Sequence, residues 1–273
     1  MKKTLSLIVG SLLILVLAAC GSSDGDSDEL VVGATSVPHS EVLEEAKPLL
    51  EEEGINLKIE TYQDYVLPNK DLDSGEIDAN YFQHIPYLEE QKAQNDFDFV
   101  NLGGIHIEPM GIYSKNIKSL EEIPEGTTVL MSRSVADHGR VLSLLEREGI
   151  IKLEEGVDKV TATVDDIVEN PKNLKFDAGI DAALLPSNYE REENALVAIN
   201  TNYAIEADLN PTEDSLILEG PESPYVNVIA ARSEDEDNEQ LKKLVEVLRS
   251  EKIQNFIKEE YNGAVVPAGG SEE

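Results

Sequence analysis

The sequence contains one cysteine, no tryptophan and five phenylalanines in 273 residues. Because a disulfide needs two cysteines, no internal disulfide can form, and the fold must depend on its hydrophobic core. The sequence also has no Gly-x-Ser-x-Gly element, no P-loop and no dinucleotide-binding glycine fingerprint. Neighbouring acids such as Asp165 and Asp166 are expected by chance in so acidic a chain. We therefore expect no catalytic activity and no cofactor, and an extracellular hydrolase is the least favoured function.

Basic residues are scarce, with 22 Lys and Arg against 55 Asp and Glu. Without residues 1–19, which contain Lys2 and Lys3, the balance is 20 basic against 55 acidic residues, a net charge of −35. Such a charge repels nucleic acid and anionic lipid headgroups, so we expect neither as a partner. The acids are spread along the chain, which indicates a solvated acidic surface and would suit a salty or alkaline exterior.

The only long apolar run is at the beginning, from Leu5 to Leu17, and it ends in Leu-Ala-Ala-Cys at Cys20. The pattern predicts a secretory signal at 1–19. Leu-Ala-Ala-Cys resembles a bacterial lipobox, in which the cysteine sulfur is lipidated and becomes the mature N-terminus. A plain signal peptide and an uncleaved anchor helix are the alternatives, although the run is short against the roughly 20 residues that span a membrane. Residues 21–29 contain only Gly, Ser, Asp and Glu, so 20–29 is predicted to be a flexible tether.

The rest of the chain, about 240 residues from Leu30, is long enough for two lobes. An apolar strand at 30–34 precedes a helix that Ser40 is expected to cap and Gly54 to end, and a second strand follows at 57–62. Strand, helix and strand in this order predict a right-handed crossover, a parallel sheet and the α/β class.

Aromatic and amide residues gather in the segment 63–88, QDYVLPNKDLDSGEIDANYFQHIPYL. The pattern predicts a short helix after Pro68, a short strand at 77–79, and a second helix whose first turn contains Pro86. Polar and aromatic side chains at a strand-to-helix junction of an α/β sheet favour a small-ligand site. Tyr65, Phe82 and His84 are the candidate wall of that site; the alternative is that the rings belong to the core.

Three further side chains follow predicted strands of the second half. Arg140 is expected in the first turn of a helix at 136–148, where an external anion would meet free N–H groups and a guanidinium. The alternative is a surface ion pair with one of the many acids. Asn200 follows a strand at 195–199 and either faces a cleft or caps the next helix. Asn227 lies in a buried strand, so its amide needs a ligand, a water or a backbone partner.

A metal-binding import protein is the competing hypothesis, because His39, His84, His106, Glu108 and His138 are available as ligands. None of them has the close spacing of a zinc motif, so no metal site is predicted. Stoichiometric zinc retained on purification without an amino acid would favour that hypothesis.

Five motifs, in order, resemble one family. They are VGATSVPHSEVLE at 32–44, QDYVLPN, IDANYFQHIPYL, Gly139-Arg140 and VENPKNLK at 168–175. The match covers nearly all of 31–266 and is to the NlpA/MetQ family, the methionine-binding lipoproteins that serve ATP-binding-cassette (ABC) importers. The family's loop pattern is roughly P-N-D-P-x-N-x-G-R. This chain keeps Gly139-Arg140 and departs from the pattern over 132–138.

The resemblance implies a two-lobed periplasmic-binding-protein fold, type II-like, with a hinge of two crossovers near Tyr113 and Asn227. Lobe 1 would comprise 30–112 and 227–271, and lobe 2 would comprise 113–226. It also implies a protein lipid-anchored at Cys20 on the extracytoplasmic face of the cell membrane, which delivers L-methionine or a similar amino acid to an ABC permease.

An amino-acid zwitterion fits the candidate residues. Arg140 would bind the carboxylate through charge-assisted hydrogen bonds, and the side-chain oxygens of Asn200 and Asn227 would accept from the ammonium. Tyr65, Phe82 and the flat face of His84 would enclose the apolar arm. Arg140 and the aromatic residues are expected on different lobes, so the ligand would favour the closed state by bridging them.

Overall fold

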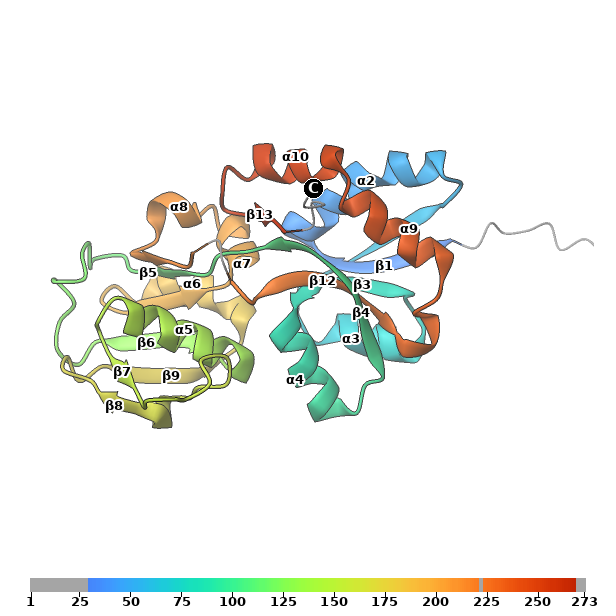
Figure 1. The fold of residues 1–273 in the computed structure, drawn as a ribbon. Coiled ribbons are helices and arrows are strands. Elements are labelled where there is room, and N and C mark those ends of the chain that lie inside the picture. The colour runs from blue at the N-terminus through green and yellow to red at the C-terminus, as the bar shows by residue number, and fades with distance from the viewer. Residues whose placement is uncertain (1–28, 221–222, 269–273) are drawn as a thin grey trace, which may run out of the picture.

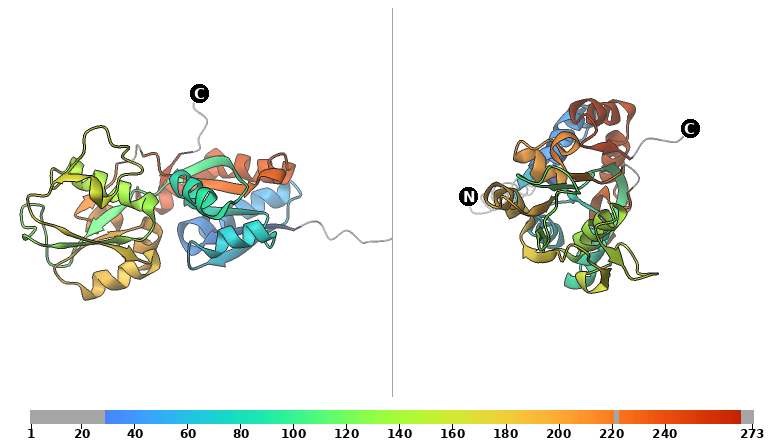
Figure 2. Two further views of the ribbon diagram at one scale, coloured as in Figure 1. Left: turned by 90° about the horizontal axis from the view of Figure 1, so that it is seen from below. Right: turned by 90° about the vertical axis from the view of Figure 1, so that its left-hand side faces the viewer.

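The structure, a computed structural model, describes residues 29–220 and 223–268. The predicted signal and nearly all of the predicted tether lie outside these residues. Two β-sheets, each covered by helices on both faces, form two lobes side by side (Figures 1 and 2). The predicted α/β class and two-lobed architecture are confirmed. No helix within the described ranges is long and apolar enough to cross a membrane.

The first lobe is built on a six-stranded sheet of order β13-β4-β12-β3-β1-β2. β1 pairs in parallel with β2 and β3, as the strand–helix–strand pattern predicted, and β12 is antiparallel to β3 and β4. The strands are β1 (Leu30–Thr35), β2 (Leu57–Tyr62), β3 (Ala79–His84), β4 (Phe99–Ile107), β12 (Val226–Arg232) and β13 (Val266–Pro267). The helical elements are η1 (Ser36–Ser40), α2 (Glu41–Glu52), α3 (Leu67–Ser74), α4 (Ile85–Asn95), η4 (Ser233–Asp235), α9 (Glu239–Leu248) and α10 (Glu251–Glu260).

Strand β12 shows how this sheet separates two apolar layers. Ile229 and Ala231 pack in the core under α2, α9 and α10, whereas Val228 and Ala230 pack on the other face with residues of α3 and α4. The alternation follows from the two-residue period of a strand, and Figure 1 shows the two helical layers. The two C-terminal helices, α9 and α10, thus belong to the first lobe.

The second lobe contains a five-stranded sheet of order β11-β5-β10-β6-β9 and a small β7–β8 pair. Along β10, Leu196 and Ala198 face the core beneath α5, and Val197 and Ile199 face α6 and α7. The strands are β5 (Gly111–Tyr113), β6 (Thr128–Ser132), β7 (Lys152–Leu153), β8 (Ile167–Glu169), β9 (Lys175–Ile180), β10 (Leu196–Ile199) and β11 (Ile217–Leu218). The helical elements are α5 (Val135–Arg147), η2 (Val164–Asp166), η3 (Ala182–Leu184), α6 (Leu185–Arg191), α7 (Thr201–Glu206) and α8 (Pro211–Asp214).

The chain passes between the sheets twice, from β4 to β5 through 108–110 and from β11 to β12 through 219–225. The two links are joined, because the Glu219 N–H donates to the Met110 carbonyl over 3.0 Å. The predicted limit between 112 and 113 falls inside β5, whose residues all pair in the second sheet. The sheets thus place the first crossover slightly before the position expected from the sequence, and the exact lobe limits remain a proposal.

The segment 63–88 differs from its prediction in one respect. The strand expected at 77–79 is β3, and it consists of Ala79–His84, the residues that we assigned to a junction. A buried amide network makes this polar strand possible: Gln83 Nε2 donates to Asn69 Oδ1 and to Asn80 Oδ1, each over 2.8 Å. The two helices around β3 are present as predicted, α3 ending at Gly75 in the left-handed conformation and α4 with Pro86 in its first turn.

Candidate functional site

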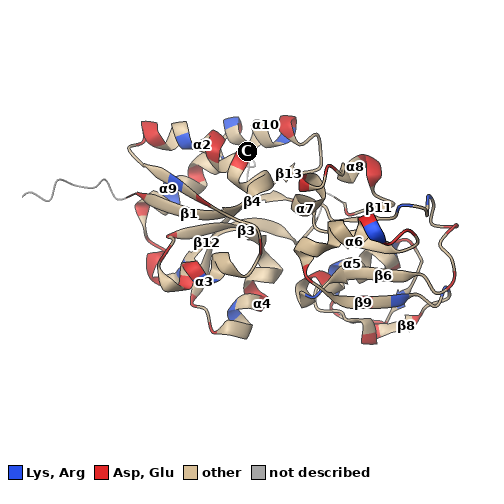
Figure 3. Ribbon diagram, turned by 180° about the vertical axis from the view of Figure 1, so that it is seen from behind, with Lys and Arg blue, Asp and Glu red and all other residues tan. Residues whose placement is uncertain are grey.

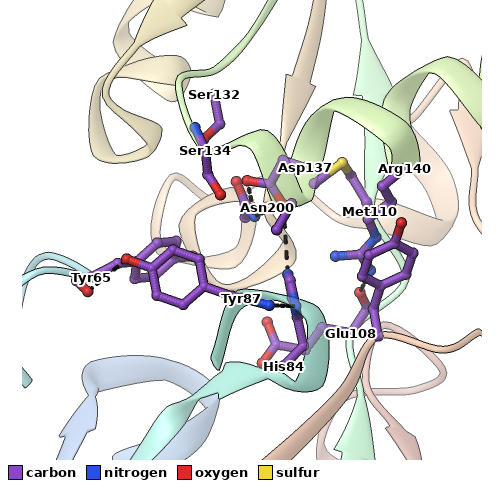
Figure 4. A network of polar contacts seen from close by, with 12 residues as sticks. Tyr65, His84, Tyr87, Glu108, Met110, Ser132, Ser134, Asp137, Arg140 and Asn200 are labelled. Carbon is purple, nitrogen blue, oxygen red and sulfur yellow. Dashed lines mark hydrogen bonds and ion pairs between the residues drawn. The ribbon is translucent and has the colours of Figure 1, made fainter. Parts of the chain in front are cut away.

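A cavity between the lobes brings together all six side chains that the sequence predicted for the ligand site. Tyr65, Phe82, His84 and Asn227 come from the first lobe, and Arg140 and Asn200 come from the second. The other lining residues are Tyr87, Glu108, Asp137, Thr201 and Asn202. Figure 4 shows the polar part of this cavity, where α4 of the first lobe faces α5 of the second. The predicted residues thus share one cavity, and their contacts with a ligand remain a proposal.

The aromatic wall is an interlocked group of rings. The Tyr65 ring lies 5.9 Å from that of Phe82 and 5.0 Å from that of Tyr203, between ring centroids. The Tyr87 hydroxyl donates to the Tyr65 carbonyl over 2.9 Å, and the Tyr65 hydroxyl donates to Asn202 Oδ1 in the opposite lobe over 2.5 Å. These rings therefore form core and cavity wall at once, so both interpretations of them apply.

Arg140 is buried, with 4% of its surface exposed, but its guanidinium already has an anionic partner. Nε and Nη2 both donate to Glu219 Oε2, over 2.9 and 2.5 Å, and Nη2 also donates to the Glu108 carbonyl. The guanidinium stands 4.5 Å from the centre of the Tyr225 ring, a cation–π contact. Arg140 therefore has the predicted location in the cleft, while its charge is balanced by an acid of the second crossover.

The N-terminus of α5 does not offer the free anion site that we expected there. The helix begins at Val135, which places Arg140 in its second turn rather than its first. Glu90 of α4 reaches across from the first lobe and accepts from the Val135 and Ala136 N–H groups, over 3.3 and 3.0 Å, and from the Ser134 hydroxyl over 3.0 Å. The Glu90 carboxylate therefore accepts hydrogen bonds from N–H groups at the start of α5 that an external anion would otherwise bind.

Asp137 is a cavity residue that the sequence analysis missed. Its side chain is 4% exposed, and it lies between His84 Nε2, 3.6 Å away, and Asn200 Nδ2, which donates over 3.3 Å (Figure 4). Burial acts to raise the pKa of the Asp137 carboxyl, but the His84 imidazole, the Arg140 charge and the Asn200 amide outweigh it and lower that pKa below its usual range. The cavity therefore contains a buried carboxylate that is ionised at neutral pH.

Two amides of the second lobe each carry one buried polar atom without a hydrogen-bond partner among the described residues. These atoms are Asn200 Oδ1, an acceptor, and Asn202 Nδ2, a donor. Asn200 occupies the N-cap position of α7, yet its side chain makes no capping bond, so capping does not explain it. Buried polar groups are nearly always paired, so both atoms mark places where a ligand or water would bind.

Asn227 has a polar partner that the sequence did not predict. Its Oδ1 lies 3.1 Å from His39 Nε2 inside the first lobe. The amide N–H₂ group can donate and the oxygen keeps a second lone pair, so the part of Asn227 in ligand binding stays a prediction.

Of the five candidate metal ligands, three converge. Glu108 Oε1 lies 2.8 Å from His106 Nε2 and 3.0 Å from His39 Nε2, all three residues being buried. Burial acts to raise the pKa of Glu108, but the two imidazoles lower it well below its usual range. His84 lies near Asp137, and His138 Nε2 lies 2.9 Å from the Ser132 carbonyl.

Comparison with known proteins decides the family. The NlpA lipoprotein family model matches residues 30–269. The chain belongs to the NlpA lipoprotein family. The family that the motifs predicted is therefore confirmed, and the match covers both lobes.

Two of the following three similar proteins are binding proteins by name. The methionine-binding lipoprotein MetQ of Bacillus subtilis (strain 168) is 47% identical over 275 residues, which cover 98% of this chain and 99% of that protein. A structure described as a pheromone cOB1 precursor/lipoprotein of the YaeC family, from Enterococcus faecalis V583, is 56% identical, with a TM-score of 0.85 over 88% of this chain and 99% of the other. A nutrient binding protein from Burkholderia cenocepacia bound to methionine is 42% identical, with a TM-score of 0.82 and the same coverage.

The NlpA-family loop pattern contains a signal that would have revealed Asp137. Counted back from Gly139-Arg140, residue 137 occupies the position of the asparagine in P-N-D-P-x-N-x-G-R. An acid in the place of an amide, three residues before the predicted Arg140, lies on the same face of the helix. Glu219 and Glu90 carried no such signal, because each is one of 55 acids and acquires its role through the fold.

Proposed function

We propose that this chain is an extracytoplasmic substrate-binding lipoprotein, anchored through lipid at Cys20, that captures L-methionine or a closely similar amino acid and delivers it to the permease of an ABC importer. Family membership, the methionine-binding relatives and the two-lobed fold support this role. The cleft supports binding rather than catalysis, because its residues pair with one another instead of activating a nucleophile.

The main observation behind the proposal is that two buried amide atoms in one cavity have no hydrogen-bond partner among the described residues. Asn200 Oδ1 can accept a hydrogen bond from an ammonium group, and Asn202 Nδ2 can donate one to a carboxylate oxygen. An α-amino acid presents these two groups on adjacent atoms. The cavity thus offers an acceptor and a donor to the two ends of a zwitterion.

The aromatic wall would hold the apolar arm. Burying a methionine side chain contributes about 1.5–3 kcal/mol, and sulfur–aromatic contacts add about 0.3–1.5 kcal/mol. Tyr65 and Phe82 supply such faces, and the Tyr65 hydroxyl already bonds to the opposite lobe. A ligand touching both walls would stabilise the closed form, which a permease can then distinguish from the open form.

The first test is identification of the natural ligand. The purified protein is denatured, and the released small molecules are analysed by mass spectrometry; we expect methionine at a near-stoichiometric amount. Calorimetric titration of the stripped, refolded protein with L- and D-methionine then measures the affinity for each enantiomer. Release of no amino acid, together with no heat of binding at millimolar methionine, would reject the proposal.

Metal-ion import is a second candidate, favoured by one observation. His39, His106 and Glu108 place their ligand atoms within 4.8 Å of one another. These atoms already hydrogen-bond in pairs, so a zinc ion would have to replace those bonds. Elemental analysis of protein purified without chelator separates the two functions, because zinc at one equivalent without bound amino acid supports import of the metal.

A further inference from the structure

The sequence contains one Asn-Gly pair, Asn262-Gly263, and the pair lies in a tight turn between α10 and β13. Both residues have a positive φ, 47° for Asn262 and 91° for Gly263, and the Ala264 N–H donates to the Tyr261 carbonyl over 2.8 Å. Positive φ at both central residues is typical of a type I′ turn, for which Asn-Gly is a preferred pair. The backbone conformation therefore explains why these two residues occur here.

The same pair is chemically labile, because glycine has no side chain to shield its own backbone nitrogen. Attack of the Gly263 nitrogen on Cγ of Asn262 closes a five-membered ring. Both residues are exposed to water. Among the residues that the structure describes, neither the Gly263 N–H nor the Asn262 side-chain amide has a hydrogen-bond partner. The attacking group and the leaving group are therefore both free to react.

We propose that Asn262 is a site of spontaneous covalent modification, at which the side-chain amide is lost and the residue becomes aspartate or isoaspartate. The Gly263 nitrogen bonds to Asn262 Cγ, the Cγ–Nδ2 bond breaks, and ammonia leaves with the proton from Gly263. Water then opens the resulting succinimide at one of its two bonds to the Gly263 nitrogen. Cleavage at Cγ gives aspartate, whereas cleavage at the main-chain carbonyl carbon gives isoaspartate, whose main chain runs through Cγ.

Asn173 is a matched control within the same chain. It is also exposed and has a φ of 50°, but its Nδ2 donates to Glu125 Oε1 over 2.6 Å. The next residue is Leu174, which has a side chain, and its N–H donates to Asn170 Oδ1 over 2.9 Å. The attacking group and the leaving group are both held at this position, so we expect Asn173 to react far more slowly.

The turn borders a groove that both lobes line, where the chain passes from α10 to β13 beside α8 (Figure 1). A Cβ built on Gly263 would meet Cγ2 of Thr212 in α8 at 4.0 Å. Conversion adds a negative charge to a groove that already contains Glu260 and Asp208. Isoaspartate also lengthens the backbone of the turn by one carbon. We therefore expect the modification at Asn262 to destabilise the turn and its packing next to the second lobe.

Peptide mapping of the detergent-solubilised full-length protein tests the chemistry. The protein is kept at pH 7 and at pH 9, digested at acidic pH to limit further conversion, and analysed by liquid chromatography and mass spectrometry. We expect Asn262 to convert at least about tenfold faster than Asn173, because only Asn262 precedes a glycine. Conversion should be faster at pH 9, because hydroxide removes the Gly263 proton. Equal rates at the two positions, or no product at Asn262 at pH 9, would overturn the proposal.

Asn262→Gly is the matching variant, because Gly-Gly also fits a type I′ turn and has no amide to lose. Anion exchange separates the converted fraction of the natural protein by its additional negative charge. Its melting temperature should lie about 2–4 °C below that of the unconverted fraction. Asn262→Gly protein stored in the same way should yield no comparable amount of a more acidic fraction.

Each outcome bears on a different part of the inference. Equal melting temperatures of the two fractions would overturn the predicted destabilisation, and an equal amount of the more acidic fraction from Asn262→Gly protein would overturn the assignment to Asn262. The inference goes beyond the proposed function and is independent of it, because no measurement involves a ligand.

Discussion

At the scale of single residues, the buried pair of Arg140 and Glu219 is the contact with the largest expected effect on stability. The side chains are 4% and 10% exposed, so neither charge is well solvated. Glu219 Oε2 also accepts from the Met110 N–H over 3.1 Å, which ties the pair to both crossovers. Removal of one partner from a buried ion pair leaves an uncompensated charge, at a cost of about 3–5 kcal/mol.

Arg140→Ala should therefore lower the free energy of unfolding of the ligand-free protein by about 3–5 kcal/mol, as measured by urea denaturation. The double variant Arg140→Ala, Glu219→Gln should recover a large part of this loss, because it removes the unpaired acid as well. A single variant as stable as the natural protein would show that solvent reaches Glu219 and that the pair matters little.

Asp137 predicts a pH dependence of stability. Its carboxyl has a lowered pKa in the folded state, so the ionised form stabilises the fold above the unfolded pKa of about 3.9, and this contribution is lost as the pH falls. The natural protein should be more stable than Asp137→Asn at pH 7, and the difference should shrink as the pH decreases through about 4. Urea denaturation of both ligand-free proteins at pH 7 and pH 3.5 measures it, and a difference independent of pH would contradict the shift.

The sequence predicted which residues line the cavity better than it predicted their hydrogen-bond and ion-pair partners. Tyr65, Phe82, His84, Arg140, Asn200 and Asn227 all line one cavity, because segments near the strand ends of both sheets face the space between the lobes. The acids Glu90 and Glu219 could not be singled out among 55, since burial and pairing arise only when distant segments pack, whereas the position of Asp137 in the loop pattern could have revealed it. The contact of Asn227 with His39 could not be predicted, because it spans 188 positions.

At the scale of elements, hydrogen bonds between α4 of the first lobe and the start of α5 in the second lobe join the two lobes. Glu90 accepts three hydrogen bonds from the first turn of α5 and from Ser134. A carboxylate at a helix N-terminus also interacts favourably with the helix dipole, by about 0.3–1 kcal/mol. This contact joins the two lobes, so it stabilises their present arrangement without a ligand.

Glu90→Gln should shift the ligand-free protein toward the open form, because the amide is a weaker acceptor and carries no charge. The measurement is the radius of gyration in small-angle scattering, which should increase, with a matching decrease of ligand affinity by about two- to tenfold. Glu89→Gln is the control: Glu89 neighbours Glu90 on α4, pairs with Lys92 and is exposed. Equal radii for both variants would show that Glu90 does not hold the lobes together.

Element prediction succeeded where apolar periodicity was strong and failed where polar residues are buried. The helices α2 and α5 follow from regular apolar spacing. The sequence predicted a strand only at 77–79, because Asn80, Gln83 and His84 are typical of loops. In the structure, the side-chain amides of Asn80 and Gln83 hydrogen-bond to Asn69 instead of to water, and Asn69 is eleven residues away from Asn80.

At the scale of the whole molecule, acidic residues lie on the helices and loops of both lobes (Figure 3). Without the signal segment the net charge is −35, so like charges repel one another throughout the folded protein. Salt screens this repulsion, since the Debye length falls from about 10 Å at 0.1 M to about 3 Å at 1 M.

The melting temperature of the ligand-free protein should therefore rise between 0.05 M and 1 M sodium chloride. Differential scanning calorimetry measures it, and betaine at equal osmolality is the uncharged control, which separates screening from solute exclusion. A flat or falling melting temperature in salt would show that the scattered ion pairs, rather than repulsion, dominate the surface.

The link at 108–110 and the second link, whose Glu219 is bonded to Met110, limit how the halves of the molecule can move. Two adjacent attachments leave one easy degree of freedom, rotation about the line through both, and they resist sliding. One distance between a probe on each half then reports the entire range of motion. Because Cys20 is the only natural thiol, cysteines introduced at Lys70 and Arg133 would each accept a fluorophore without competition from the folded halves.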